Sequence, residues 1–161
     1  LVPEVSMDVA ATRGYASGGV LTFYFAYGSN MNTRQMAYRC PRAEPVGVAS
    51  LEGYSLAERA YADIDRDPQA IVWGVLWRVP VQGLSRLDTY EGCPGFYRRF
   101  ETSVVVRDPE YGSSPPVNAW VYEMAPHCKI MRAGDPWDEA YRQACAEGAR
   151  EHGLPVNAFT R

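Results

Sequence analysis

One apolar stretch, residues 71–79 (IVWGVLWRV), constrains the fold of this chain more than any other feature. It consists almost entirely of β-branched, aromatic and aliphatic side chains, which is typical of a strand buried in a sheet. Pro80 closes it, because proline cannot donate the next hydrogen bond of a ladder. Runs of the same kind, some less regular, predict further strands at Leu21–Ala26, 46–57, 97–106 and Val117–Met124.

Three segments have helical spacing or helix-end signals. The first helix is predicted from a cap at Asn30 or Asn32 to about Arg39, and the second ends at residues 92–95 (GCPG). The third is predicted to be capped by Asp135. One face of this third helix carries Trp137, Tyr141, Cys145 and Gly148.

These segments lack the regular strand–helix–strand alternation of parallel α/β folds, and they predict an α+β domain whose mixed sheet curls toward a barrel. The Asp-rich stretch 61–70 is predicted to be a loop. Residues 21–161 are expected to form a single domain. Residues 1–20 have no continuous apolar region, so we expect a poorly ordered arm rather than a signal peptide. Met7 is a candidate natural start behind a foreign extension.

Composition excludes several classes of function. The net charge of −3 argues against a duplex nucleic-acid binder. No apolar run approaches the roughly 18 residues of a membrane span, so cytoplasm is the expected location. The four cysteines are scattered without a C-x-x-C pair, and two histidines are too few for a metal centre, so free thiols and no metal are expected. Asp63, Asp65 and Asp67 lack the glycine and closing glutamate of a calcium loop.

Two segments are candidates for chemistry. The first is the turn Tyr27, Gly28, Ser29, Asn30, Met31, where a strand passes into a helix. Successive N–H groups at such a turn can bind a carboxylate or an oxyanion, although the residues alone favour a plain turn.

The second candidate is Glu91, which shares the apolar face of its helix with Leu84 and Leu87. Burial and the negative end of the helix dipole would both raise the pKa of this carboxyl group toward that of a general acid or base. A frayed helix end with a solvated Glu91 is the equal alternative. Tyr97 and Tyr141 can donate hydrogen bonds to a ligand, but core packing is the better expectation for both, and for Trp73, Trp77 and Trp120.

Taken together, these motifs resemble the γ-glutamylcyclotransferase-like (AIG2-like, BtrG-like) family. FYFAYGSNM at 23–31 looks like its signature loop, VWGVLWRV at 72–79 its central strand, and LDTYEG at 87–92 the segment with its catalytic glutamate. Tyr141 and GAREHGLP at 148–155 are similar to its closing helix. The resemblance covers most of the chain, from about residue 23 to 155.

The resemblance implies a barrel-like sheet with flanking helices, a pocket over the YGSN loop, and neither metal nor cofactor. It also implies a small γ-glutamyl substrate that is cyclised to 5-oxoproline, with Glu91 as the catalytic acid and base. The substrate-binding residues would be Tyr27, Gly28, Ser29, Asn30, Met31, Tyr97 and Tyr141.

Some features leave alternatives open. The loop reads YGSN, unlike the YGSL form of the glutathione-specific branch, which disfavours glutathione as substrate. Residues 126–135 (PHCKIMRAGD) show no familiar pattern and could form one side of a leaving-group pocket. A γ-glutamylamine or γ-glutamyl metabolite as substrate, a non-catalytic ligand-binding protein, and a monomer or a homodimer all remain alternatives. An inward carboxylate at Glu91 argues against the binding protein, because burying it is costly.

Overall fold

The computed structural model describes residues 19–160, so most of the predicted N-terminal arm lies outside the described part. The centre is a closed barrel in which strands pair in the order β2-β3-β1-β6-β4, and β4 pairs again with β2. A short strand, β5, extends the sheet beyond β4. The strands are Leu21–Ala26 (β1), Glu44–Arg59 (β2), Tyr61–Pro80 (β3), Tyr97–Asp108 (β4), Gly112–Ser113 (β5) and Val117–Met124 (β6).

Strand directions make this a mixed barrel. β1 pairs antiparallel with β3 and parallel with β6, where Tyr24 lies opposite Trp120. The remaining pairs among the described strands are antiparallel. The predicted α+β class and mixed, barrel-like sheet are therefore confirmed.

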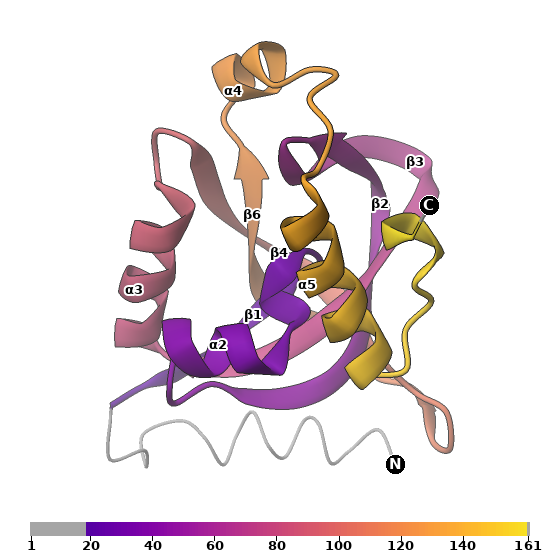
Figure 1. Ribbon diagram of the computed structural model, residues 1–161. Coiled ribbons are helices and arrows are strands. Elements are labelled where there is room, and N and C mark those ends of the chain that lie inside the picture. The colour runs from indigo at the N-terminus through magenta and orange to yellow at the C-terminus, as the bar shows by residue number, and fades with distance from the viewer. Residues whose placement is uncertain (1–18, 161) are drawn as a thin grey trace.

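Helices lie against this barrel, and Figure 1 shows α2, α3 and α5 along one side of it and α4 at its upper end. Asn32 caps α2, because its side chain accepts a hydrogen bond from the Gln35 N–H at 3.1 Å. The helices are η1 (Ser29–Met31), α2 (Thr33–Arg39), α3 (Val81–Glu91), α4 (Pro126–Met131), α5 (Glu139–Glu151) and η2 (Asn157–Phe159).

The predicted start of the last helix was wrong. Asp138 caps α5 by accepting a hydrogen bond from the Tyr141 N–H at 2.8 Å. Asp135 instead belongs to the turn after α4, where its N–H donates to the Arg132 carbonyl at 3.0 Å. Aspartates lie on both sides of Pro136, and either satisfies the sequence rule for a helix cap.

The predicted loop at residues 61–70 was also wrong, because this stretch is the first half of β3. It pairs with β2 in a hairpin that turns at Ala60, whose φ is 63°, and Leu56 lies opposite Ile64. Ala62 and Ile64 are buried in the core. Two of the aspartates that suggested a loop, Asp63 and Asp65, are accommodated because cations pair with them.

These cations and aspartates form what we call the Asp63 cluster, consisting of Arg59, Asp63, Asp65 and Lys129. Asp63 is fully buried and accepts hydrogen bonds from Arg59 at 2.8 Å, Lys129 at 3.0 Å and the Met124 N–H at 2.9 Å. Arg59 and Lys129 also bind Asp65, at 2.7 and 2.9 Å. The cluster joins α4 to the hairpin, and its carboxylates are already paired with protein cations rather than arranged around a metal.

The core fills the barrel with apolar side chains, including fully buried Phe25, Val75 and Leu76. Trp77 lies in this core as predicted, but Trp73 is 43% exposed and Trp120 is only partly buried. The guanidinium of Arg99 covers the Trp120 ring at 4.4 Å, which gives this tryptophan a cation–π partner in place of deep burial.

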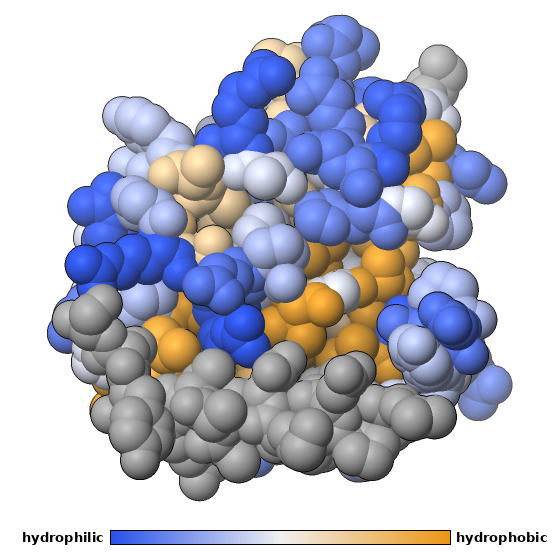
Figure 2. All heavy atoms as spheres, turned by 90° about the horizontal axis from the view of Figure 1, so that it is seen from below, coloured by the Kyte–Doolittle hydropathy of each residue, from blue (hydrophilic) through white to orange (hydrophobic). Residues whose placement is uncertain are grey.

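The surface is hydrophilic over most of the face in Figure 2, with apolar side chains gathered in the middle of that face. Among residues 19–160, no helix is long and apolar enough to cross a membrane. All four cysteines are free thiols, and Cys40, Cys128 and Cys145 are buried.

Candidate active site

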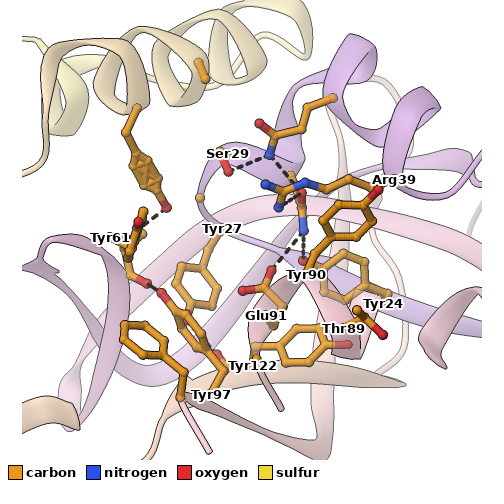
Figure 3. Close-up of a pocket in the computed structure, with 18 of the residues that line it drawn as sticks. Tyr24, Tyr27, Ser29, Arg39, Tyr61, Thr89, Tyr90, Glu91, Tyr97 and Tyr122 are labelled. Atoms are coloured by element: carbon orange, nitrogen blue, oxygen red, sulfur yellow. Dashed lines mark hydrogen bonds between the residues drawn. The ribbon is translucent and has the colours of Figure 1, made fainter. Parts of the chain in front are cut away.

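A cavity of about 650 Å³ opens where the YGSN loop, the end of α3, the start of β4 and helix α5 meet. Figure 3 shows a ring of aromatic side chains around it, with the Glu91 carboxylate pointing inward between Tyr24 and Tyr27. Segments far apart in the sequence therefore contribute to a single site.

Because Gly28 has no side chain, the YGSN loop can lie close to the β2–β3 hairpin and to α5. A Cβ atom at this position would lie 2.8 Å from the Tyr141 hydroxyl and 3.0 Å from the Ala62 Cβ. The φ of Gly28 is −120°, so a left-handed backbone is not the reason for glycine here. The residue is required by space, which its position in the sequence did not reveal.

Asn30 is the centre of a hydrogen-bond network and is only 3% exposed. Its carbonyl oxygen accepts from Gln35 Nε2 at 2.9 Å and from Arg39 Nη1 at 3.1 Å. A guanidinium can only donate, so the amide orientation of Asn30 is determined. Its NH₂ group therefore faces the other way and donates to Tyr24 at 3.0 Å and to Glu91 Oε1 at 3.1 Å.

Glu91 is the last residue of α3, and Gly92 follows it in the left-handed conformation that commonly ends a helix. The side chain is half-buried in the cavity. Burial raises the pKa of its carboxyl group to about 7, and the nearby Asp88 adds to the rise. Arg39 and the hydrogen bond from Asn30 oppose this shift. The carboxylate points inward as predicted, and α3 extends through Glu91, which excludes the frayed-helix alternative.

The predicted tyrosines line the cavity, but their hydroxyls form hydrogen bonds with the protein backbone. Tyr27 donates to the Tyr122 carbonyl and Tyr97 to the Ala62 carbonyl, each at 2.6 Å. The Tyr141 hydroxyl accepts from the Ala62 N–H at 3.0 Å. Burial is the main cause of the raised pKa of each of these three tyrosines, so all three stay protonated at neutral pH. They form rigid walls.

Other predicted residues differ in their position. Ser29 lines the cavity and accepts a hydrogen bond from Gln35 Nε2 at 2.6 Å. Met31 is 1% exposed, packs in the core and is not among the residues that line the cavity.

Several cavity residues were missed by the sequence reasoning. Gln35 and Arg39 are four positions apart on α2, and this spacing puts both on the face toward Asn30. That pattern was readable, whereas the contributions of distant strands and turns were not. Arg132 also lines the cavity, and it belongs to the segment 126–135 that was considered as one side of a pocket. The other missed residues include Tyr24, Tyr61, Tyr90, Phe96 and Tyr122.

The described residues contain no group of three or more histidine, cysteine, aspartate or glutamate side chains able to hold a metal. The polar groups that line the cavity are mainly neutral donors and acceptors, with two carboxylates and two arginines. Such a site can bind a small polar molecule and exchange a proton with it through Glu91.

Comparison with known proteins agrees with this geometry. The model of the family described as gamma-glutamyl cyclotransferase, AIG2-like, matches residues 24–139. This chain belongs to that family. The gamma-glutamylcyclotransferase of Mus musculus is 33% identical over 157 residues, with 89% of this chain and 78% of the relative covered. The Bos taurus protein of the same name is 30% identical over 146 residues, or 83% and 72% of the two chains.

The structural comparison places the barrel in the same family. A solved gamma-glutamyl cyclotransferase aligns with a TM-score of 0.68 at 27% identity, and the alignment covers 86% of this chain and 84% of the other. The resemblance deduced from the YGSN and LDTYEG motifs is therefore confirmed over most of the domain.

Proposed function

We propose that this protein is a γ-glutamylcyclotransferase. The substrate is a γ-glutamyl amide, and its own α-amino group attacks the γ-carbonyl carbon. The new C–N bond closes the five-membered ring of 5-oxoproline, and the original amide C–N bond breaks to release an amine or amino acid. The reaction consumes no water and needs no nucleophile from the protein. The family membership supports this activity.

Glu91 is the proposed acid and base. The α-amino group is an ammonium at neutral pH, so it must lose a proton before it can attack. A carboxylate in the cavity whose pKa lies near 7 can take this proton and later give it to the departing amine. This half-buried carboxyl group, held by Asn30, is the observation that carries the proposal.

The YGSN loop is proposed to bind the anionic part of the substrate. The N–H groups of Ser29 and Asn30 open η1, and the first N–H groups of a helix have no partner within it. Groups of this kind suit the γ-glutamyl carboxylate or the tetrahedral oxyanion. The rigid tyrosine walls would hold the substrate folded so that its amine meets the γ-carbonyl.

The test is direct. The purified protein is incubated with γ-glutamyl amino acids and γ-glutamyl amines, and 5-oxoproline is measured by mass spectrometry. Glu91→Gln is expected to lower kcat by about 10²- to 10⁴-fold, the usual contribution of a positioned acid or base. The glutamine amide oxygen can still accept from Asn30, so the fold should remain intact.

Glu101→Gln is the matched control, because Glu101 is exposed on β4 and does not line the cavity. It should retain wild-type turnover. Full activity of Glu91→Gln would refute the assigned role of Glu91. Absence of 5-oxoproline with every substrate would refute the proposed function.

A further inference from the structure

An aromatic wall leads away from Glu91 toward the mouth of the cavity. Phe96 begins it, because its N–H donates to the carbonyl of Gly92, the residue after Glu91, at 2.8 Å. The Tyr61 ring packs edge-on against Phe96 at 6.0 Å and against Tyr141 at 5.2 Å. All three rings line the cavity, and Figure 3 shows Tyr61 across from Glu91. A group attached to a γ-carbonyl beside Glu91 would lie along this wall.

Arg132 lines the cavity at the same wall. It follows α4, and its guanidinium carbon lies 5.9 Å from the centre of the Phe96 ring. The backbone around it is fixed, because its N–H donates to the Cys128 carbonyl at 2.9 Å and its carbonyl accepts from the Asp135 N–H at 3.0 Å. The turn therefore fixes the backbone position from which this side chain extends.

The positive charge of Arg132 is only weakly paired within the protein. Its ion pair with Asp135 measures 3.6 Å, and the two side chains are 44% and 46% exposed. Pairs of this kind are worth at most about 1 kcal/mol. The other arginine of the cavity is Arg39, which donates to Asn30 and covers the Tyr90 ring at 4.9 Å. Arg132 is thus the better placed of the two to receive a new anion beyond the reaction centre.

We propose that Arg132 is a specificity-determining residue, which binds the carboxylate of the leaving amino acid and so favours γ-glutamyl amino acids over γ-glutamyl amines. This inference rests on the proposed cyclotransferase function. A γ-glutamyl amino acid carries a carboxylate on its leaving group, and a γ-glutamyl amine does not. A guanidinium binds a carboxylate through two parallel hydrogen bonds, which gives both affinity and orientation. The aromatic wall accommodates the side chain of the leaving amino acid.

The test compares two substrates that differ only in this carboxylate, γ-glutamylalanine and γ-glutamylethylamine. Wild type is expected to prefer γ-glutamylalanine. Arg132→Gln should lower kcat/KM for γ-glutamylalanine by about 10- to 100-fold, the range of a charge-assisted interaction, mainly through KM. It should change kcat/KM for γ-glutamylethylamine by less than about two-fold, and Arg132→Lys should recover part of the lost preference.

Arg98→Gln is the matched control. Arg98 is 55% exposed, has a similarly loose ion pair of 3.9 Å with Glu123, and does not line the cavity. It should leave both substrates unaffected. Equal losses for the two substrates with Arg132→Gln, or no loss for either, would overturn the role of Arg132 and leave the cyclotransferase standing. Absence of 5-oxoproline from both substrates with wild type would overturn this inference, and absence from the whole panel of γ-glutamyl compounds would overturn the cyclotransferase as well.

Discussion

At the level of single residues, the Glu91 carboxyl group determines how the proposed reaction depends on pH. It must be ionised to accept the ammonium proton, and its pKa is about 7. We therefore expect kcat/KM to rise with pH and to reach half of its plateau near pH 7. Asn30→Ala removes a hydrogen bond that lowers this pKa, so its midpoint should move to higher pH. Rate profiles from pH 5 to 9 for both proteins measure this shift.

The same group makes stability depend on pH with a definite sign. The ordinary pKa of 4.5 applies to the unfolded chain, and the folded protein holds the proton up to about pH 7. Between these values the folded state binds more protons, so the free energy of unfolding falls as pH rises. Glu91→Gln lacks this penalty. Its stability relative to wild type should increase by roughly 1–3 kcal/mol between pH 5 and pH 8.

Urea unfolding of both proteins at the two pH values measures this difference. The other titrating groups cancel in the comparison, because they are common to both. A constant difference between Glu91→Gln and wild type would mean that the folded carboxyl group titrates like one in the unfolded chain. That result would contradict the raised pKa on which its catalytic role depends.

At the level of elements, the contact of α5 with the YGSN loop depends on Gly148. A Cβ atom there would lie 2.5 Å from the Asn32 nitrogen and 2.6 Å from the Met31 carbonyl carbon. Helix propensity alone predicts that Gly148→Ala stabilises the protein by about 1 kcal/mol. We expect the opposite, a loss of roughly 1–3 kcal/mol from overpacking, together with reduced activity as the loop is displaced.

Thermal unfolding and the 5-oxoproline assay test this expectation. Gly95→Ala is the control, because the nearest atom to its Cβ would be the Gly92 carbonyl oxygen at 3.7 Å, an ordinary contact. A Gly148→Ala protein that is more stable than wild type and fully active would show that α5 can move away from the loop without cost.

The strands were largely predictable because runs of β-branched, aromatic and aliphatic residues mark them in the sequence. Residues 71–79 and Leu21–Ala26 became parts of β3 and β1 as expected. The prediction of a loop at residues 61–70 was wrong because its aspartates were interpreted without their cationic partners. One of these partners, Lys129, lies in a helix 64 positions beyond Asp65. Charge pairing across such a separation leaves no local signal in the sequence.

The candidate site was predictable in part for the same reason. The helical spacing of Glu91 indicated its inward position, and the motif resemblance indicated the loop. The hydrogen bond between Asn30 and Glu91 joins residues 61 positions apart. The hydrogen bonds that the Tyr27 and Tyr97 hydroxyls donate to backbone carbonyls join residues 95 and 35 positions apart. Only the closed barrel brings these groups together.

At the level of the whole molecule, the Asp63 cluster fastens the hairpin to β6 and α4. Asp63→Ala would leave Arg59, Lys129 and the Met124 N–H without this carboxylate. Removing one member of a buried charged network costs about 3–5 kcal/mol, and we expect a loss of that size in the free energy of unfolding.

The control for this experiment is Asp67→Ala. Asp67 is only partly buried, and its carboxylate accepts a hydrogen bond from the Gln69 N–H at 3.0 Å. Its removal should cost less than about 1 kcal/mol in chemical denaturation. Equal stability of the two variants would show that the cluster contributes no more than a surface turn.

The contact between the end of the YGSN loop and α5 affects when the site can form during protein synthesis. Asn32 donates to the Ala144 carbonyl at 3.2 Å, across 112 positions of sequence. Ribosomes add about 5–20 residues per second, so roughly 6–20 s pass between the synthesis of Asn32 and the synthesis of its partner Ala144 in α5. A nascent chain that stalls before α5 therefore carries the signature motif and Glu91 but cannot complete the site. We therefore expect cyclotransferase activity only from chains that include α5.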